Sequence, residues 1–239
     1  MSNIGSFGRV RVFEDFLGAP EATAMTTIAA SIGGVAYVSV NEGTMTALVD
    51  EPGGIVRVTT DTADNDNFAM YAGPFKPSDG GVVMEARFKM ADITTGAIYC
   101  GFTETLDATT PVMPAEFDTV TMTYGGAGSM VGLQFDSDGT TDLFRAVFGD
   151  GGAAASKADA NGTASVAAVN DEFDVVRAEI STDGRCSVYH DGKLIKQIDT
   201  VLTTTDLQFA VLMIENRSGA ASVLEVDYFY AEGGRDWTV

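Results

Sequence analysis

The chain has 239 residues, a length that one large all-β domain can fill without splitting into two. It carries 34 acidic and 14 basic residues, and the formal net charge of −20 opposes binding to nucleic acid or anionic membranes, since phosphates are contacted by Lys and Arg. No stretch approaches the ~20 apolar residues of a membrane span, and the first residues lack the apolar run of a signal peptide. We therefore expect a protein made in the cytoplasm, with neutral, basic or polysaccharide partners and with neither nucleic acid nor a membrane among them.

The N-terminal segment is predicted to be an arm followed by a strand. Residues 1–8 are small and polar, as is common for termini that become ordered only on a partner. In the run RVRVFEDFL, Val10 and Val12 alternate with charged or aromatic residues, which is the period of a half-buried strand. We assign residues 1–13 to the arm and first strand, and residues 14–239 to a single β-sandwich domain.

Strand signals separated by Gly-rich or Asx-rich turns then follow at short intervals. They are VAYVSV from Val35, MTALVD from Met45, GIVRVTT from Gly54, FAMYAGPFKP from Phe68 and VVMEARFKM from Val82. In the last of these, Met84, Ala86 and Phe88 alternate with charged residues. The sheet that contains this strand should therefore have one face in water.

The second half of the chain repeats the pattern. Its predicted strands are AIYCGFTET, TVTMTY, VGLQFD, DLFRAVFG, the meander EFDVVRAEISTDGRCSVYHDGKLIKQI, LQFAVLMIENR and ASVLEVDYFYAEG. The stretch from Gly149 to Val166 has low complexity and is predicted to be a mobile excursion. The nearly continuous apolar run from Leu207 to Ile214 is typical of a central strand that is covered on both faces.

These signals favour an all-β fold. About 12 to 14 short strands with turns every 8–12 residues, and without long helices, predict a two-sheet antiparallel jelly-roll sandwich. Cys100 and Cys186 both lie in predicted strands, so buried free thiols are expected rather than a disulfide.

Two acidic residues in the last strand suggest one catalytic hypothesis. Glu225 and Asp227 are two residues apart and so share a face about 7 Å apart, a spacing that glycoside hydrolysis can use. The laminarinase-like glycosidases, which this fold resembles, carry a Glu-x-Asp-x-Glu signature, whereas Phe229 stands at the third position here. We expect instead that both acids are solvated, opposite a face of Leu224, Val226, Tyr228 and Tyr230.

The sequence does not indicate a catalytic or zinc-binding role for histidine. His190 is the single histidine, and a triad would need a nucleophile and an orienting acid that one sequence cannot place. Zinc sites usually draw on several His or Cys ligands. We therefore expect a structural role for His190 beside the Asp191-Gly192 turn.

Calcium is the one cofactor that the acidic turns allow. The candidate ligands lie in DTADNDN and DSDGTTD, and they are Asp61, Asp64, Asp66, Asp136, Asp138 and Asp142. Neither turn matches the twelve-residue calcium loop, and Asx-rich turns also form without a metal. No cofactor is therefore expected, with calcium as the alternative.

Carbohydrate binding would need aromatic platforms. The single tryptophan, Trp237, lies at the C-terminal end, and most Phe and Tyr residues fall where a core needs them. Tyr71, Phe75 and Tyr124 are not explained in this way and could line a groove or an interface.

Five segments together carry a family resemblance. They are DNDNFAMYAGPFKPSDGGVVMEARFKM, AIYCGFTET, VGLQFDSDGTTDLFRAVFGD, FDVVRAEISTDGRCSVYHDGKLI and ENRSGAASVLEVDYFYAEGGR. Over roughly residues 60–235, the chain resembles concanavalin-A-like sandwich proteins encoded by tailed bacteriophages. The resemblance implies a structural protein of the virion, without catalytic residues, that decorates the outer capsid surface.

The predicted function is therefore capsid decoration in a tailed phage, with the major capsid protein as partner and a homo-oligomer, preferably a trimer, as the binding form. The residues predicted to contact the partner are Phe7, Arg9, Arg11 and Phe13. A carbohydrate-binding module for host adhesion is the alternative, and a laminarinase-like glycoside hydrolase is the third hypothesis.

Overall fold

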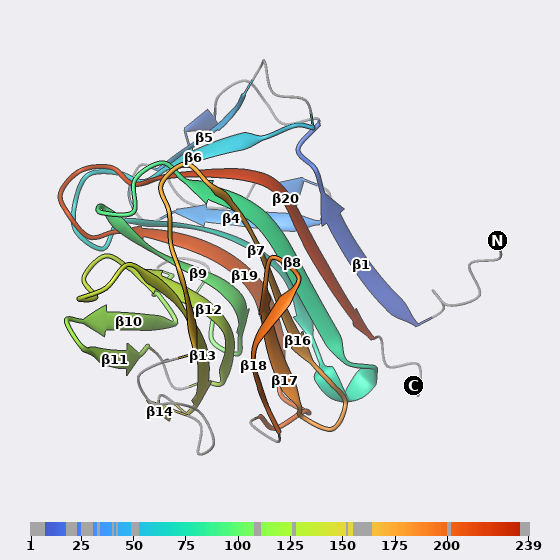
Figure 1. Ribbon diagram of the computed structural model, residues 1–239. Coiled ribbons are helices and arrows are strands. Elements are labelled where there is room, and N and C mark those ends of the chain that lie inside the picture. Colours follow the sequence, from blue (N-terminus) through green and yellow to red (C-terminus); the bar gives the residue numbers. More distant parts are fainter. Residues whose placement is uncertain are drawn as a thin grey trace.

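The structure is a computed structural model that describes residues 8–17, 23–24, 31–32, 34–39, 41, 43–48, 53–107, 111–125, 128–151, 153–154, 164–199 and 202–234. In these ranges the chain forms two nine-stranded antiparallel sheets that pack face to face, and one two-stranded sheet (Figure 1). The two-sheet antiparallel sandwich predicted from the sequence is confirmed. No helix in the described ranges is long and apolar enough to cross a membrane.

The first sheet has the strand order β18-β17-β16-β8-β20-β6-β5-β2, with β1 paired to the second half of β20. Its strands are β1 (Arg9–Glu14), β2 (Thr23–Ala24), β5 (Thr44–Ala47), β6 (Val56–Thr59), β8 (Val82–Met90), β16 (Phe173–Ile180), β17 (Cys186–His190), β18 (Lys193–Ile198) and β20 (Val223–Gly234).

The second sheet has the order β14-β13-β12-β9-β19-β7-β4-β3, with β15 also paired to β13. Its strands are β3 (Ser31–Ile32), β4 (Val35–Ser39), β7 (Asn67–Phe75), β9 (Gly96–Thr103), β12 (Met130–Asp136), β13 (Leu143–Asp150), β14 (Ala153–Ala154), β15 (Ser165–Ala167) and β19 (Gln208–Asn216). The small sheet is a hairpin of β10 (Ala115–Asp118) and β11 (Thr121–Tyr124), and a 3-10 turn η1 spans Pro77–Asp79.

The main core lies between the two large sheets. The predicted alternation in β8 is confirmed, because Met84, Ala86 and Phe88 are fully buried there. Cys100 and Cys186 also face this core and are free thiols, as expected. Burial raises the pKa of the Cys186 thiol to about 12, so this thiol is unreactive at neutral pH.

A second core lies on the outer face of the second sheet, beneath the β10–β11 hairpin. Phe117 and Met122 of the hairpin pack there against Val211 and Met213 of β19. The alternate residues of β19, such as Leu212, face the main core. The prediction that this apolar strand is covered on both faces is therefore confirmed, and the hairpin supplies the second cover.

The low-complexity stretch from Gly149 to Val166 does not lie wholly outside the sheets. Within it β14 and the first residues of β15 pair with β13, whereas residues 152 and 155–163 lie outside the described ranges. Composition missed these pairings because a short strand can be held by backbone hydrogen bonds with small side chains.

Candidate functional site

A row of aligned residues, three of them polar, crosses four adjacent strands at one end of the second sheet. The strand register aligns Asp136 of β12, Ala97 of β9, Glu215 of β19 and Asn67 of β7. All of them are buried, because the β10–β11 hairpin and the segment before it cover this face. Buried polar groups need hydrogen-bonding partners, so this row must be paired internally.

Arg217 supplies the pairing. Its Nη2 lies 3.1 Å from Asp136 Oδ2, its Nε lies 3.2 Å from Asp136 Oδ1, and its Nη1 lies 2.5 Å from Glu215 Oε1. The Arg217 side chain is 4% exposed, and those of Asp136 and Glu215 are 0% and 3% exposed. Ala97 stands between the two carboxylates in the register, and its small side chain leaves room for the guanidinium. One buried cation therefore holds two buried carboxylates.

The same row fastens the hairpin to the sheet. Asp136 Oδ2 accepts a hydrogen bond from the backbone N–H of Phe117 at 2.9 Å. Asn67 Nδ2 donates to the carbonyl oxygen of Pro111 at 2.7 Å and to Glu215 Oε2 at 3.1 Å. The polar row thus fixes the position of the covering segment, in addition to the apolar contacts beneath it.

A pocket of about 310 Å³ opens beside Arg217. The residues that line it come from the 61–66 turn, the hairpin, the 136–139 turn and the end of β19, and they are Asp64, Asn65, Glu116, Phe117, Asp118, Thr119, Asp138 and Arg217. Arg217 also contacts the residues that line the pocket: its Nη1 donates a 2.9 Å hydrogen bond to Asn65 Oδ1. Its Nη2 lies 3.8 Å from a Glu116 carboxylate oxygen, and its Nε lies 4.0 Å from one of Asp138. We call this site the acidic pocket.

A second hollow of about 260 Å³ adjoins the acidic pocket and shares Phe117 and Thr119 with it. Its other lining residues are Val120, Thr140, Leu143, Arg145 and Ser165. The guanidinium of Arg145 lies 4.2 Å above the Phe117 ring, which holds the ring in place. Val120 is 64% exposed and gives this hollow an apolar rim.

The acidic pocket is strongly negative. Burial, followed by repulsion from Asp136, raises the pKa of the Asp138 carboxyl. Burial also raises the pKa of Glu215 to about 7, although Arg217 opposes the shift. Burial alone would lower the pKa of Arg217, but Asp136 and Glu215 raise it, so the guanidinium stays charged. The pocket therefore favours ligands that donate hydrogen bonds or carry positive charge.

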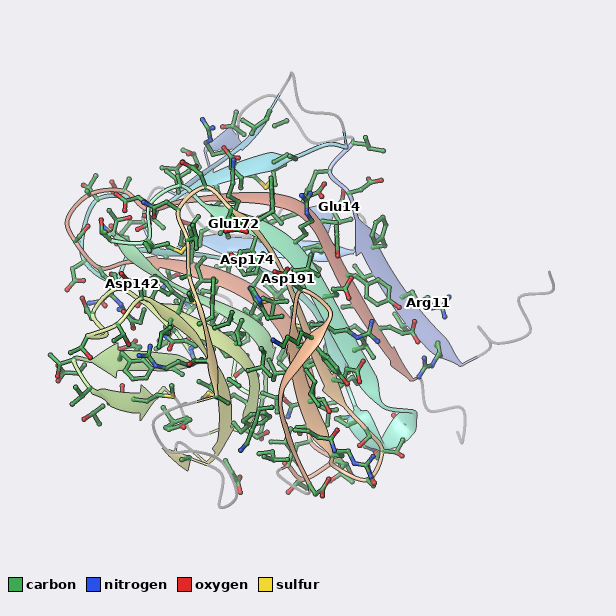
Figure 2. All side chains as sticks on the ribbon, viewed as in Figure 1. Arg11, Glu14, Asp142, Glu172, Asp174 and Asp191 are labelled. Carbon is green, nitrogen blue, oxygen red and sulfur yellow. The ribbon has the colours of Figure 1, made fainter. Side chains whose placement is uncertain are left out.

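The structure divides the six predicted calcium ligands. Asp64, Asp136 and Asp138, from two separate turns, meet around Arg217. Asp61 and Asp66 instead accept hydrogen bonds from backbone N–H groups of their own turn, at Thr62 and Ala63. Asp142 is exposed, and it lies apart from the other labelled acids at the left of Figure 2.

The arrangement of these acids does not fit a calcium site as it stands. Calcium takes six to eight oxygen ligands close together. Among the described residues, only Asp174, His190 and Asp191 bring three ligand atoms within 4.8 Å of one another. In the acidic pocket, the Arg217 guanidinium already occupies the position between Asp136 and Glu215.

His190 has an acidic partner, which was not among the predicted site residues. Its Nε2 lies 2.6 Å from Asp174 Oδ1, and its Nδ1 lies 3.5 Å from Asp191 Oδ2. Burial lowers the pKa of His190, but the Asp174 carboxylate outweighs this effect and raises it. Both ring nitrogens face carboxylates and neither faces a hydroxyl or thiol, so the geometry is that of a structural ion pair rather than a triad.

The prediction that Glu225 and Asp227 are solvated is wrong. Glu225 is buried between Arg57 and Lys89, and Asp227 pairs with Arg87. A β-bulge between Val226 and Tyr228 also resets the alternation. As a result, Tyr228 and Tyr230 lie outward with the acids, whereas Phe229 and Ala231 face the core.

The aromatic candidates for a groove lie elsewhere. Tyr71 is packed edge-on against Phe209 over the second core, and Tyr124 packs against the same core. Phe75 is buried in the main core and also lines a hollow beneath β1. Trp237 lies outside the described residues, as does Phe7 of the predicted partner-binding set.

The other predicted partner-binding residues lie on β1. Arg9 and Arg11 both pair with Glu232 of β20. Phe13 is 57% exposed, with its ring centroid 6.0 Å from that of Tyr228.

Sequence reasoning missed Arg217, Glu215, Glu116 and Asp118. One signal was present, because Glu215 and Arg217 come directly after the apolar run from Leu207 to Ile214. Ionisable groups so close to a buried strand need partners in the fold.

Comparisons with known proteins agree with the architecture. A protein of unknown function from Shewanella oneidensis MR-1 matches with a TM-score of 0.65 at 13% identity, over 97% of this chain and 89% of that one. The carbohydrate recognition domain of Emp47p matches with a TM-score of 0.55 at 15% identity, over 90% and 96% of the two chains. Peanut lectin matches with a TM-score of 0.52 at 14% identity, over 94% and 97%.

No protein-family model matches the sequence. No curated protein matches it either. The chain has a concanavalin-A-like, legume-lectin-like β-sandwich fold, and at these identities the comparisons show the fold alone.

Proposed function

We propose that this chain is a carbohydrate-recognition domain and that the acidic pocket is its binding site. The observation that carries the proposal is a cavity of about 310 Å³ lined by four carboxylates, two of which, those of Glu116 and Asp138, lie within 4.0 Å of the buried Arg217 guanidinium. Sugar hydroxyls donate hydrogen bonds, and preformed carboxylate and amide oxygens are suited to accept them. The carbohydrate recognition domain of Emp47p, which has the same fold, supports this function.

The adjoining hollow extends the proposed site beyond a single sugar. Its hydroxyl groups, at Thr119, Thr140 and Ser165, can donate or accept hydrogen bonds. Phe117 and the exposed Val120 offer apolar surface to the C–H groups of a sugar ring. A ligand of two linked sugars would lie across the boundary at Thr119.

Charge selects the class of sugar. Four carboxylates line the acidic pocket, and the guanidinium of Arg217 is already bound by Asp136 and Glu215. Neutral sugars and amino sugars suit this lining, whereas uronic, sialylated or sulfated sugars would be repelled.

A glycan array followed by calorimetry tests the proposal. Neutral or amino sugars should bind, and Asp138→Ala should weaken the affinity by about tenfold or more, since it removes a pocket carboxylate while the backbone N–H that bonds to Asp136 remains. Asp199→Ala is the matched control, because it removes the same charge from an exposed position on the first sheet. Absence of binding on the array, or equal affinity in the two variants, would contradict the proposal.

Capsid decoration stays a prediction that rests on the sequence resemblance. The lectin-like relatives favour carbohydrate recognition over it. Mass spectrometry of purified virions tests it directly, because a decoration protein must be present in the particle and its loss must lower particle stability.

Glycoside hydrolysis also stays a prediction, and the geometry gives it little support. Glu225 and Asp227 are held in ion pairs by Arg57, Lys89 and Arg87. Sugar release that is lost in Asp227→Asn would establish it.

A further inference from the structure

Within the described part of the chain, strand β1 lies at an edge of the first sheet. Among the described strands, only β20 pairs with it, from Arg9 opposite Gly234 to Glu14 opposite Phe229 (Figure 1). In an antiparallel ladder, alternate residues bond to the neighbouring strand, so half of the peptide groups of β1 point away from β20. Such an edge is a template for another strand unless it is protected.

A hollow of about 380 Å³, lined by apolar side chains, glycines and backbone groups, lies beneath this edge. Its lining includes Val10 and Val12 on the inner face of β1, Phe75 and Pro74 at the end of β7, and Gly34 and Gly73. A Cβ on Gly34 would approach the Val12 side chain to 3.4 Å, so the glycine helps to keep this space open. No charged side chain is among the described residues that line the hollow.

The outer face of the same edge is positive. Arg9 and Arg11 share the carboxylate of Glu232. The arginine side chains are 35% and 56% exposed, whereas that of Glu232 is 6% exposed. Two guanidiniums over one carboxylate leave a local positive charge in a chain whose net charge is −20.

We propose that β1 is a docking edge for an extended segment of a partner protein in which apolar and acidic side chains alternate. The segment would add to the first sheet as a strand beside β1. Its inward side chains would enter this hollow beside Val10 and Val12, and its outward carboxylates would lie beside Arg9 and Arg11. Strand addition of this kind takes affinity from backbone hydrogen bonds and specificity from pockets for alternate side chains.

The charges decide against a second copy as the occupant. Antiparallel pairing of two β1 strands would place Arg9 and Arg11 of both copies on the same face of the joined sheet. Like charges on neighbouring strands are destabilising, whereas the acidic side chains of the proposed segment would lie beside these arginines.

A labelled synthetic peptide of about seven residues with alternating Glu and Val tests this inference by fluorescence anisotropy. We expect saturable binding to the wild-type chain, and binding weakened about tenfold or more when the same residues are arranged as a block of Val followed by a block of Glu. N-methylation of alternate amides gives a sharper test. Methyl groups in one phase should abolish binding, and those in the other phase should leave it unchanged, since only one set of amides faces β1.

A charge exchange tests the outer face. Arg11→Glu should weaken binding of the Glu-containing peptide by about fivefold and strengthen binding of a peptide with Lys in place of Glu, since exposed ion pairs contribute modestly. Circular dichroism checks that the variant is folded. The N-methylated peptides are tested on the wild-type chain, so that test does not depend on the folding of the variant. The inference would be overturned if neither phase of methylation changed the peptide affinity, or if the peptide did not bind at all. A dimer that the peptide dissociates in analytical ultracentrifugation would overturn the choice of occupant.

Discussion

Arg217→Met tests the organisation of the acidic pocket. The substitution keeps an unbranched side chain but removes the charge that faces Asp136 and Glu215, both of which remain buried. Removing one partner of a buried ion pair costs about 3–5 kcal/mol, because the remaining charge has lost its counter-ion. This loss is a large part of the stability of a typical domain, about 5–15 kcal/mol.

The loss should depend on pH. Without the guanidinium, which lowers it, the pKa of Glu215 must rise further, and the folded variant then binds more protons than its unfolded chain. The free energy of unfolding of the variant should therefore fall as pH rises. The difference from the wild type is largest near pH 8 and smaller near pH 5, where Glu215 can be neutral.

Urea unfolding followed by far-UV circular dichroism at both pH values measures the effect. Arg185→Met is the matched control, since among the described residues Arg185 pairs with the exposed Asp183 and Asp199, and its loss should change the free energy of unfolding little. Adding Asp136→Asn and Glu215→Gln to Arg217→Met should restore part of the loss, because no buried charge then remains unpaired. A cost below about 1 kcal/mol for Arg217→Met, without pH dependence, would refute the reasoning.

Three further predictions follow from the same structure. The pKa of Glu215 is raised from 4.5 to about 7. The free energy of unfolding of the wild type should therefore decrease by up to about 3 kcal/mol as the pH rises from 4.5 to 7, and urea titrations of Glu215→Gln should lack that decrease. The raised pKa of His190 means that its pair with Asp174 stabilises the fold at acidic pH and loses this effect as pH rises through that pKa. His190→Gln should therefore lower the melting temperature more near pH 6 than near pH 9. An equal loss at both pH values would contradict the pairing. Arg217 fills the space between Asp136 and Glu215. Adding calcium, and then a chelator, should therefore leave the melting temperature of the wild type unchanged in differential scanning fluorimetry. A rise with calcium would show that the acids rearrange around the ion.

Local patterns were sufficient to predict the strands. The alternation in β8 indicated one buried face, and the continuous apolar run of β19 indicated two. Each inference depends only on the period of side chains along a strand, which is fixed by the backbone.

Features that depend on register or on a local irregularity could not be predicted in the same way. The bulge beside Asp227 shifts the alternation of β20, and nothing in LEVDYFY marks it. The acidic pocket unites Asp64, Asp138 and Arg217, whose distances along the chain exceed 70 residues, and only the register of four strands brings them together.

The His190 pair lies between these cases. Asp174 shares the inward face of β16 with Val176, and His190 shares the inward face of β17 with Val188. The hairpin pairs Val176 with His190, so the acid is the next inward residue on the neighbouring strand. The alternation in this meander, together with its turn, therefore contained the information that places an acid beside the histidine.

Chemical-shift mapping of a bound glycan by NMR tests the central claim most directly. With the neutral or amino sugar that binds best, we expect the perturbed backbone amides to cluster at residues 64–66, 116–120 and 138–140, around the acidic pocket and the hollow beside it. Perturbations confined to the outer face of the first sheet, or none at saturating glycan, would contradict the assignment of carbohydrate recognition to this pocket.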